Sequence, residues 1–162
     1  DGVYAAHADG RGRVHDENAS VLGGVSGHAG LFSTASDLAI MMQMLMNGGT
    51  YGGKRYLNEA TIRMFTIRQS DRSTRALGWD TKNVQGYSSA GSRFSSKSFG
   101  HTGFTGTSIW ADPERNLFVI LLTNRVYPTR ENTKIFKVRP AVHDAVIDAL
   151  KSEGQASGPT GK

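Results

Sequence analysis

The chain has 162 residues, a hydrophobic share of 38% and 20 glycines, which suit one domain with its own core and many tight turns. It has no cysteine, which excludes disulfides and thiolate chemistry, and no apolar run approaches the ~20 residues of a membrane span. The net charge is +5. Because the basic residues are interleaved with acids, without a basic helix or an aromatic ladder, we expect no nucleic-acid partner.

The first 30 residues are rich in glycine and irregular. The side chains in this segment that could ligate a metal ion are those of His15, Asp16 and His28. They lack the His-x-x-x-His and His-Glu-x-x-His spacings of zinc sites. We therefore expect no metal and no other cofactor. The alternative interpretation is that Asp16 and its acidic and amide neighbours hydrogen-bond the loop backbone.

Two helices are predicted next. The first begins near residue 34, where Thr34-Ala35-Ser36-Asp37 resembles a capping box, and it ends at Asn47-Gly48-Gly49. Its apolar positions form more than one stripe, so we expect exposed apolar surface or a homo-oligomer; these positions are 38, 40, 41, 42, 44, 45 and 46. A shorter helix follows, with Asn58 as its N-cap.

The second half of the chain predicts strands and a terminal helix. Residues 76–80 are expected to form a strand, followed by an exposed loop rich in serine and glycine. Residues 99–111 and 117–123 are interpreted as two antiparallel strands joined at residues 112–116. Pro140 is expected to open the last helix, with one apolar face formed by Val142, Val146, Ile147 and Leu150.

This order of elements predicts an α+β (mixed α/β) fold, in which antiparallel strands pack against helices. Residues 1–151 are assigned to the folded domain. Residues 152–162 have the composition of a disordered tail or linker.

The segment Phe99-Gly100-His101-Thr102-Gly103-Phe104-Thr105-Gly106-Thr107 combines an imidazole, several hydroxyls and three glycines. Glycine lets a second backbone approach closely, and hydroxyls both donate and accept hydrogen bonds. These features suit a binding surface. The alternative is a glycine-rich edge strand that carries a surface histidine.

His101-Thr102-Gly103, followed by a hairpin that ends in Leu121-Leu122-Thr123-Asn124, resembles the third motif of serine β-lactamases, penicillin-binding DD-peptidases and class C-like esterases. In many members that motif is Lys-Thr-Gly. A second block, residues 14–19 followed by 22–39, is similar to the segment before the motif strand. The resemblance covers residues 14–150 and implies the C-terminal part of a β-lactamase-like fold. It also implies a location in the periplasm or cell envelope.

The resemblance implies a role for each motif residue. His101 takes the place of the family's lysine and Thr102 hydrogen-bonds the substrate, which makes both candidate catalytic residues. Gly103, Phe104 and Thr105 are candidate substrate-binding residues: the glycine keeps the wall of the site flat, and Phe104 or Thr105 offers a backbone N–H to the oxyanion. An imidazole is only partly charged at neutral pH. This departure disfavours a carboxylate-bearing β-lactam and leaves ester or peptide hydrolysis open.

Two motifs of that family are missing or displaced. None of the seven lysines follows a serine by three positions, so the chain has no Ser-x-x-Lys nucleophile motif. Tyr56-Leu57-Asn58 matches Tyr-x-Asn, but it follows the helix around Leu38 whereas the family's tyrosine precedes it. We interpret this match as coincidental. Ser108 lies near the motif in sequence and is expected to be structural.

Two functional hypotheses follow from this comparison. In the first, the chain is part of a serine hydrolase that acts on a β-lactam, a D-Ala peptide or an ester, and it is inactive alone. Its partners are then a missing N-terminal part of the same domain and a small-molecule or peptide substrate. In the second, it is a non-catalytic binding or interaction domain with the same fold.

Overall fold

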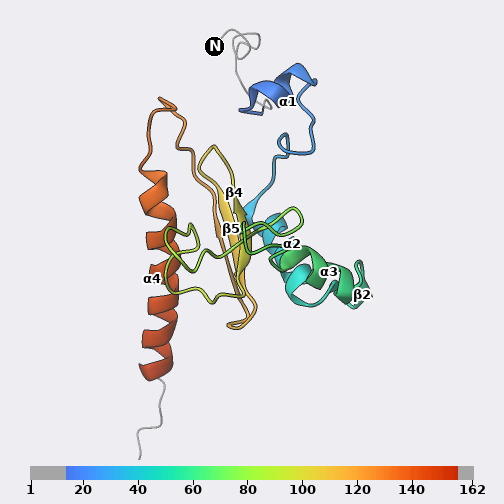
Figure 1. The fold of residues 1–162 in the computed structure, drawn as a ribbon, viewed down its shortest axis with the longest axis vertical. Helices are drawn as coiled ribbons and strands as arrows, with labels where there is room; N and C mark the ends of the chain where they lie inside the picture. Colours follow the sequence, from blue (N-terminus) through green and yellow to red (C-terminus); the bar gives the residue numbers. More distant parts are fainter. Residues whose placement is uncertain (1–13, 157–162) are drawn as a thin grey trace, which may run out of the picture. The chain divides into compact units, whose positions relative to one another are not determined.

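The computed structural model describes residues 14–156 (Figure 1). These residues divide into two compact units, 14–37 and 38–156. The boundary falls within the first turn of helix α2 (Ala35–Met46). The two units are taken separately below. Residues 157–162 of the predicted tail lie outside the described residues, and the division of the chain at residue 151 stays a prediction.

The first unit is organised around Asp16, the N-cap of helix α1 (Glu17–Val21). Its Oδ1 accepts a hydrogen bond from the Ala19 amide at 2.8 Å and lies 3.0 Å from His28 Nε2. The other ring nitrogen of His28 lies 2.7 Å from Ser26 Oγ. Asp16 thus hydrogen-bonds the backbone of α1 and a side chain of the following loop, whereas the alternative interpretation predicts bonds to the loop backbone. Among the described residues no three potential metal ligands come together.

The predicted caps of the next two helices are confirmed. Thr34 Oγ1 accepts from the Asp37 amide at 3.1 Å and donates to the Asp37 carboxylate, at the start of α2. Asn58 Oδ1 accepts from the Ala60 amide at 2.9 Å at the start of α3 (Glu59–Thr66). A short antiparallel hairpin, β1 (Thr50–Tyr51) and β2 (Lys54–Arg55), joins these helices.

A four-stranded antiparallel sheet forms the centre of the second unit, in the order β3-β4-β5-β6. Its strands are β3 (Asp80–Thr81), β4 (Phe99–Thr102), β5 (Ser108–Asp112) and β6 (Leu117–Leu121). The register pairs His101 with Ile109 and Trp110 with Val119.

The structure corrects the predicted strands in two places. The segment expected to be one strand, residues 99–111, folds back on itself, so that β4 and β5 are neighbours in the sheet. The reversal occurs because the Gly103 amide donates to the Thr107 carbonyl at 2.8 Å and Gly106 adopts a positive φ of 114°. Residues 76–79 form a tight turn rather than a strand, and β3 begins only at Asp80.

Both faces of the sheet are covered within the second unit (Figure 1). On one face Trp110 packs with Phe94 and with Ile147 of α4 (Ile135–Ala156). On the other face Phe99 and Ala111 pack with Met42 of α2. Because successive strand residues point to opposite faces, β5 contributes to both cores. This mixed arrangement of helices and antiparallel strands is the predicted fold class.

Helix α4 differs from its prediction at both ends. It begins at Ile135, so Pro140 lies inside the helix instead of opening it. The Asn132 side chain accepts from the Lys134 amide at 3.0 Å and supports the earlier start. Pro140 has no amide N–H, so the second turn of the helix lacks one backbone hydrogen bond. The helix continues to residue 156. No helix among residues 14–156 is long and apolar enough to span a membrane.

The buried face of α4 also differs from the predicted one. Ile147 is buried and Val142 and Val146 are half-buried as expected, but Leu150 is 49% exposed. The buried stripe recurs at every fourth residue, which is the spacing of one helix face, and it consists of Ile135, Arg139, His143 and Ile147. Two of its four members are therefore titratable or charged.

Candidate functional site

Strand β4 has a free edge where the candidate motif lies. Strand β3 pairs with β4 only at Phe99 and Gly100, so from His101 onward β4 has a strand neighbour on the β5 side alone, among the described residues. His101 is exposed at this edge. A free edge offers unpaired backbone groups to an extended ligand or to another segment of chain.

The His101 imidazole is held by an arginine that the sequence did not point to. Arg75 Nη1 lies 2.9 Å from His101 Nε2, and His101 Nδ1 lies 2.9 Å from the Thr102 carbonyl oxygen. Because a guanidinium only donates hydrogen bonds, Nε2 must accept and the proton must sit on Nδ1. This tautomer is inferred from the partners. The imidazole is then neutral, and the positive charge beside the motif belongs to Arg75.

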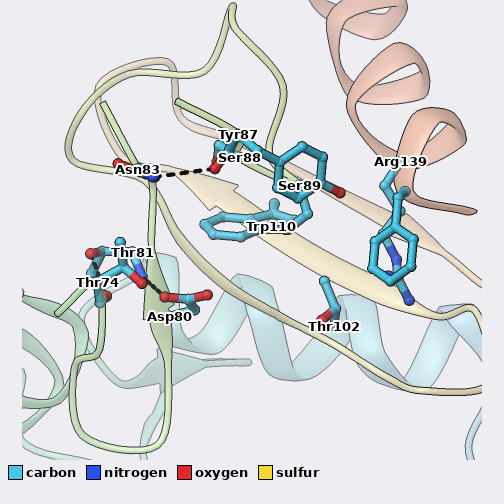
Figure 2. Close-up of a pocket in the computed structure, with 11 residues that line it drawn as sticks. Thr74, Asp80, Thr81, Asn83, Tyr87, Ser88, Ser89, Thr102, Trp110 and Arg139 are labelled. Atoms are coloured by element: carbon cyan, nitrogen blue, oxygen red, sulfur yellow. Dashed lines mark hydrogen bonds between the residues drawn. The ribbon is translucent and has the colours of Figure 1, made fainter. Parts of the chain in front are cut away.

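Thr102 faces the other side of the sheet. It lines a pocket of about 180 Å³ whose other residues include Trp110 and Arg139 (Figure 2). Most of the lining residues are of polar types and come from the segment before β4: Thr74, Asp80, Thr81, Asn83, Tyr87, Ser88 and Ser89. The predicted catalytic pair, His101 and Thr102, is therefore divided between opposite faces of β4.

The predicted substrate-binding residues lie in a loop and not on a strand. Gly103, Phe104 and Thr105 belong to the 103–107 loop, which connects β4 with β5. A side chain at position 103 would collide with Thr107 Oγ1, so the requirement for glycine comes from this contact within the loop. The Phe104 ring is 54% exposed and lies beneath the Arg125 guanidinium at 4.1 Å.

Arg139 of α4 is a second residue of the candidate site that the sequence analysis missed. It is only 5% exposed, and its Nη2 donates to the carbonyls of Gly103 at 2.6 Å and Thr107 at 2.9 Å. Burial lowers the pKa of its guanidinium. The signal that could have found it is its place among Ile135, His143 and Ile147 at helical spacing. Arg75 has no comparable signal, because it lies 26 residues before His101.

Neither Ser108 nor the Tyr56-Leu57-Asn58 match, both set aside in the sequence analysis, has the environment of a catalytic group. Ser108 is 1% exposed within the sheet, and its Oγ has no hydrogen-bond partner, so it is not placed to attack a substrate. Asn58 is engaged as the cap of α3 and Tyr56 is exposed, which agrees with a coincidental Tyr-x-Asn match.

A family model described as Beta-lactamase matches residues 1–142. The chain therefore belongs to the beta-lactamase family. A solved beta-lactamase from Mycobacterium bovis shares the fold, with a TM-score of 0.59 and 24% sequence identity, over 75% of this chain and 46% of that one.

Curated relatives give a closer sequence match. A "Putative D-alanyl-D-alanine carboxypeptidase" from Salmonella gallinarum is 42% identical over 129 residues, which cover 76% of this chain and 29% of the relative. A protein of the same name from Escherichia coli K12 is 42% identical over 116 residues, which cover 70% of this chain and 27% of that protein. The chain thus spans less than a third of the length of these relatives.

Proposed function

We propose that this chain supplies one wall of the active site of a serine hydrolase that works by acyl transfer. The observation that carries the proposal is the free edge of β4 at His101 and Thr102, which runs directly into the 103–107 loop. In this proposal the reacting groups lie at the edge of β4, where His101 reaches them from one face of the strand and Thr102 from the other. Gly103, Phe104 and Thr105 line the substrate. Family membership and the similarity to D-alanyl-D-alanine carboxypeptidases support this class of reaction.

The nucleophile must come from residues outside this chain. A serine attacks at neutral pH only with an adjacent base, which Ser-x-x-Lys supplies in this family, and no such motif occurs among the 162 residues. Under this proposal the segment that carries it packs against the free β4 edge, and the chain alone is inactive. The working compartment proposed for the enzyme is the periplasm or cell envelope.

The neutral imidazole bears on the class of substrate. With the proton on Nδ1 and Arg75 on Nε2, His101 offers no formal charge of its own to a substrate carboxylate. The neutral ring favours esters that carry no carboxylate. D-Ala peptides and β-lactams both carry a carboxylate, for which the positive charge at this site is that of Arg75.

The test uses the full-length gene product that contains this chain, beside the 162-residue chain. Both are incubated with a D-Ala-D-Ala peptide, a p-nitrophenyl ester, a chromogenic cephalosporin and a fluorophosphonate probe. We expect turnover and labelling of one Ser-x-x-Lys serine in the full-length protein, abolished by Ser→Ala at that serine, and none in the chain alone. Labelling of a serine within residues 1–162, including Ser26 beside His28, would contradict the proposal.

The second candidate function is that of a non-catalytic binding domain, and the full-length sequence distinguishes it from the first. If the full-length sequence contains neither Ser-x-x-Lys nor a Tyr-x-Asn before the helix around Leu38, the chain is a non-catalytic binding domain. In that case the full-length protein binds the D-Ala-D-Ala peptide in calorimetry without turnover.

A further inference from the structure

Every carbonyl of the 103–107 loop accepts a hydrogen bond. Arg139 Nη2 reaches the carbonyls of Gly103 and Thr107, at the two ends of the loop. The Phe104 carbonyl accepts from Arg125 Nε at 2.7 Å, and the Thr105 carbonyl accepts from the Arg125 amide at 2.8 Å. A loop with all its carbonyls engaged has little freedom to rotate its peptide units.

The remaining carbonyl of the loop is held in the same way. Gly106 has no side chain, and its carbonyl oxygen accepts a hydrogen bond from Thr123 Oγ1 at 2.6 Å. A Cβ at position 106 would collide with that hydroxyl, so the contact also requires glycine there. The loop is therefore anchored from β6's C-terminal side as well as from α4.

The two arginines are themselves fixed in place. Arg125 Nη1 donates to the carbonyls of Arg130 at 2.7 Å and Asn132 at 3.2 Å, just before α4. Its guanidinium also lies over the Phe104 ring. Arg139 is buried on α4 and extends toward the Thr102 end of β4 (Figure 2). Both donors thus reach the loop from positions that the scaffold determines.

Fixing a carbonyl also fixes the amide on the same peptide unit. The peptide bond is planar and trans, so its N–H points opposite to its C=O. Arg139, through the Gly103 carbonyl, sets the direction of the Phe104 N–H. Arg125, through the Phe104 carbonyl, sets the direction of the Thr105 N–H. These two amides are the candidate oxyanion donors, and such donors work by being oriented before the reaction begins.

We propose that Arg125 and Arg139 are positioning residues that hold the oxyanion-binding peptides of the 103–107 loop in their working orientation. The proposal rests on the proposed function, because an oriented oxyanion donor matters only if acyl transfer occurs. In this role each arginine acts through the backbone carbonyl that it holds.

The first experiment measures the loop in the 162-residue chain. Amide hydrogen exchange is followed by NMR for Arg125→Met and Arg139→Met, which remove the guanidinium donors and keep an apolar stem. We expect faster exchange at residues 103–107 with the sheet core unchanged. Both end carbonyls keep a backbone donor in Arg139→Met, since Gly106 and Gly103 amides also reach them, so the fold is expected to survive. Unchanged exchange in both variants would overturn the proposal.

Arg130→Met is the matched control for this measurement. The Arg130 guanidinium lies over the same Phe104 ring at 5.2 Å, and its removal leaves both arginine–carbonyl contacts in place. Loop exchange in this variant should equal that of the wild type. Faster exchange at 103–107 in Arg130→Met, to the same extent as in Arg125→Met, would show that ring stacking rather than the carbonyl contact holds the loop.

The second experiment measures catalysis in the full-length gene product, with kcat normalised by active-site titration so that loss of folded enzyme is not counted. We expect kcat for peptide or ester hydrolysis to fall on the order of 10²-fold in Arg125→Met or Arg139→Met, with KM little changed. Unchanged kcat in both variants, together with faster loop exchange, would overturn the positioning role.

A wild-type full-length protein that shows no acyl transfer would overturn the proposed function and, with it, any catalytic role of Arg125 and Arg139. The exchange measurement would still report whether the two arginines hold the loop. Failure of the positioning role of the two arginines and failure of the proposed function therefore give different results.

Discussion

The Arg75 guanidinium donates to the His101 imidazole across 2.9 Å, from Nη1 to Nε2, and so joins a loop before β3 to the free edge of β4. This contact makes His101 a neutral acceptor at Nε2 and places the local positive charge on Arg75. At the motif position that carries lysine in many members of this class, the hydrogen-bonding ring and the positive charge therefore belong to two different residues.

The tautomer of His101 provides a direct check. In the 162-residue chain, ¹⁵N NMR of the imidazole should show the proton on Nδ1, because Arg75 requires an acceptor at Nε2. Arg75→Met should increase the population with the proton on Nε2. Arg72→Met, a change in the same exposed loop, is the control and should leave the tautomer as in the wild type. A wild-type ring protonated on Nε2 would contradict the arrangement.

Substitution of His101 tests whether the neutral ring matters for activity. In the full-length protein, His101→Lys would set an ammonium against the Arg75 guanidinium, and kcat/KM should fall on the order of 10²-fold. Adding Arg75→Gln should recover part of the loss, because it removes the like charge. His101→Ala should also lose on the order of 10²-fold. Unchanged kcat/KM in His101→Ala would mean that this strand is only structural.

Asp112 predicts a loss of stability in acid. Burial by itself raises the pKa of this carboxyl, but hydrogen bonds from the Ser95 amide and hydroxyl and from Arg115 outweigh it and hold the pKa below its ordinary value of 3.8. The unfolded chain therefore takes up the proton first as the pH falls. The stabilisation is present above about pH 3.8 and is lost as the pH falls through the lower folded-state pKa.

The measurement is urea unfolding of wild type and Asp112→Asn. At pH 7 the variant should be less stable by about 1–3 kcal/mol, because buried donors lose their acceptor. The difference in unfolding free energy between wild type and Asp112→Asn should become smaller as the pH falls below about 3.8. Asp71→Asn, at an exposed position, is the control, and its unfolding free energy should equal that of the wild type at each pH. An equal gap at pH 7 and pH 3 would refute the assignment.

His143 predicts a separate pH dependence at milder acidity. It is buried on α4, its Nδ1 lies 2.7 Å from the Arg139 carbonyl, and its ring stands edge-on to Phe94. Burial lowers its pKa below the ordinary 6.5. As the pH falls below about 6.5 the unfolded chain binds the proton first, so the free energy of unfolding decreases.

The check compares the slope of unfolding free energy against pH, between pH 7.5 and pH 5, in wild type and His143→Gln. The variant should show a shallower slope, because it has no proton to take up at this position. Equal slopes would mean that His143 titrates alike in the folded and unfolded states.

The apolar face of α2 predicts self-association of the isolated chain. Met42 is buried against the sheet, whereas Ile40 is 46% and Met41 37% exposed on the same helix. Sedimentation velocity should show a concentration-dependent dimer or larger species, which Ile40→Glu with Met41→Glu converts to monomer. Val84→Glu, at an exposed apolar position in a loop, should not. A monomeric wild type that binds no hydrophobic dye would remove the basis for this prediction.

The sequence alone determined the features that depend on a few neighbouring residues. The caps at Thr34 and Asn58 follow from side chains that satisfy amides two or three positions away, and helix α2 follows from the spacing of its apolar residues. The His101-Thr102-Gly103 motif and the missing Ser-x-x-Lys are also local patterns. They were sufficient to predict the mixed fold and the family.

Only the tertiary structure decided how the motif is held. Arg75 meets His101 across 26 residues and Arg139 meets Gly103 across 36, and no periodicity in the chain encodes which distant partner a buried or edge group will find. The split of one predicted strand into β4 and β5 comes from the local Gly103–Thr107 hydrogen bond and the positive φ of Gly106, and Arg125 and Arg139 add donors from distant segments to the carbonyls of that turn. Long-range hydrogen bonds, which local sequence patterns do not specify, therefore determine the geometry of the site.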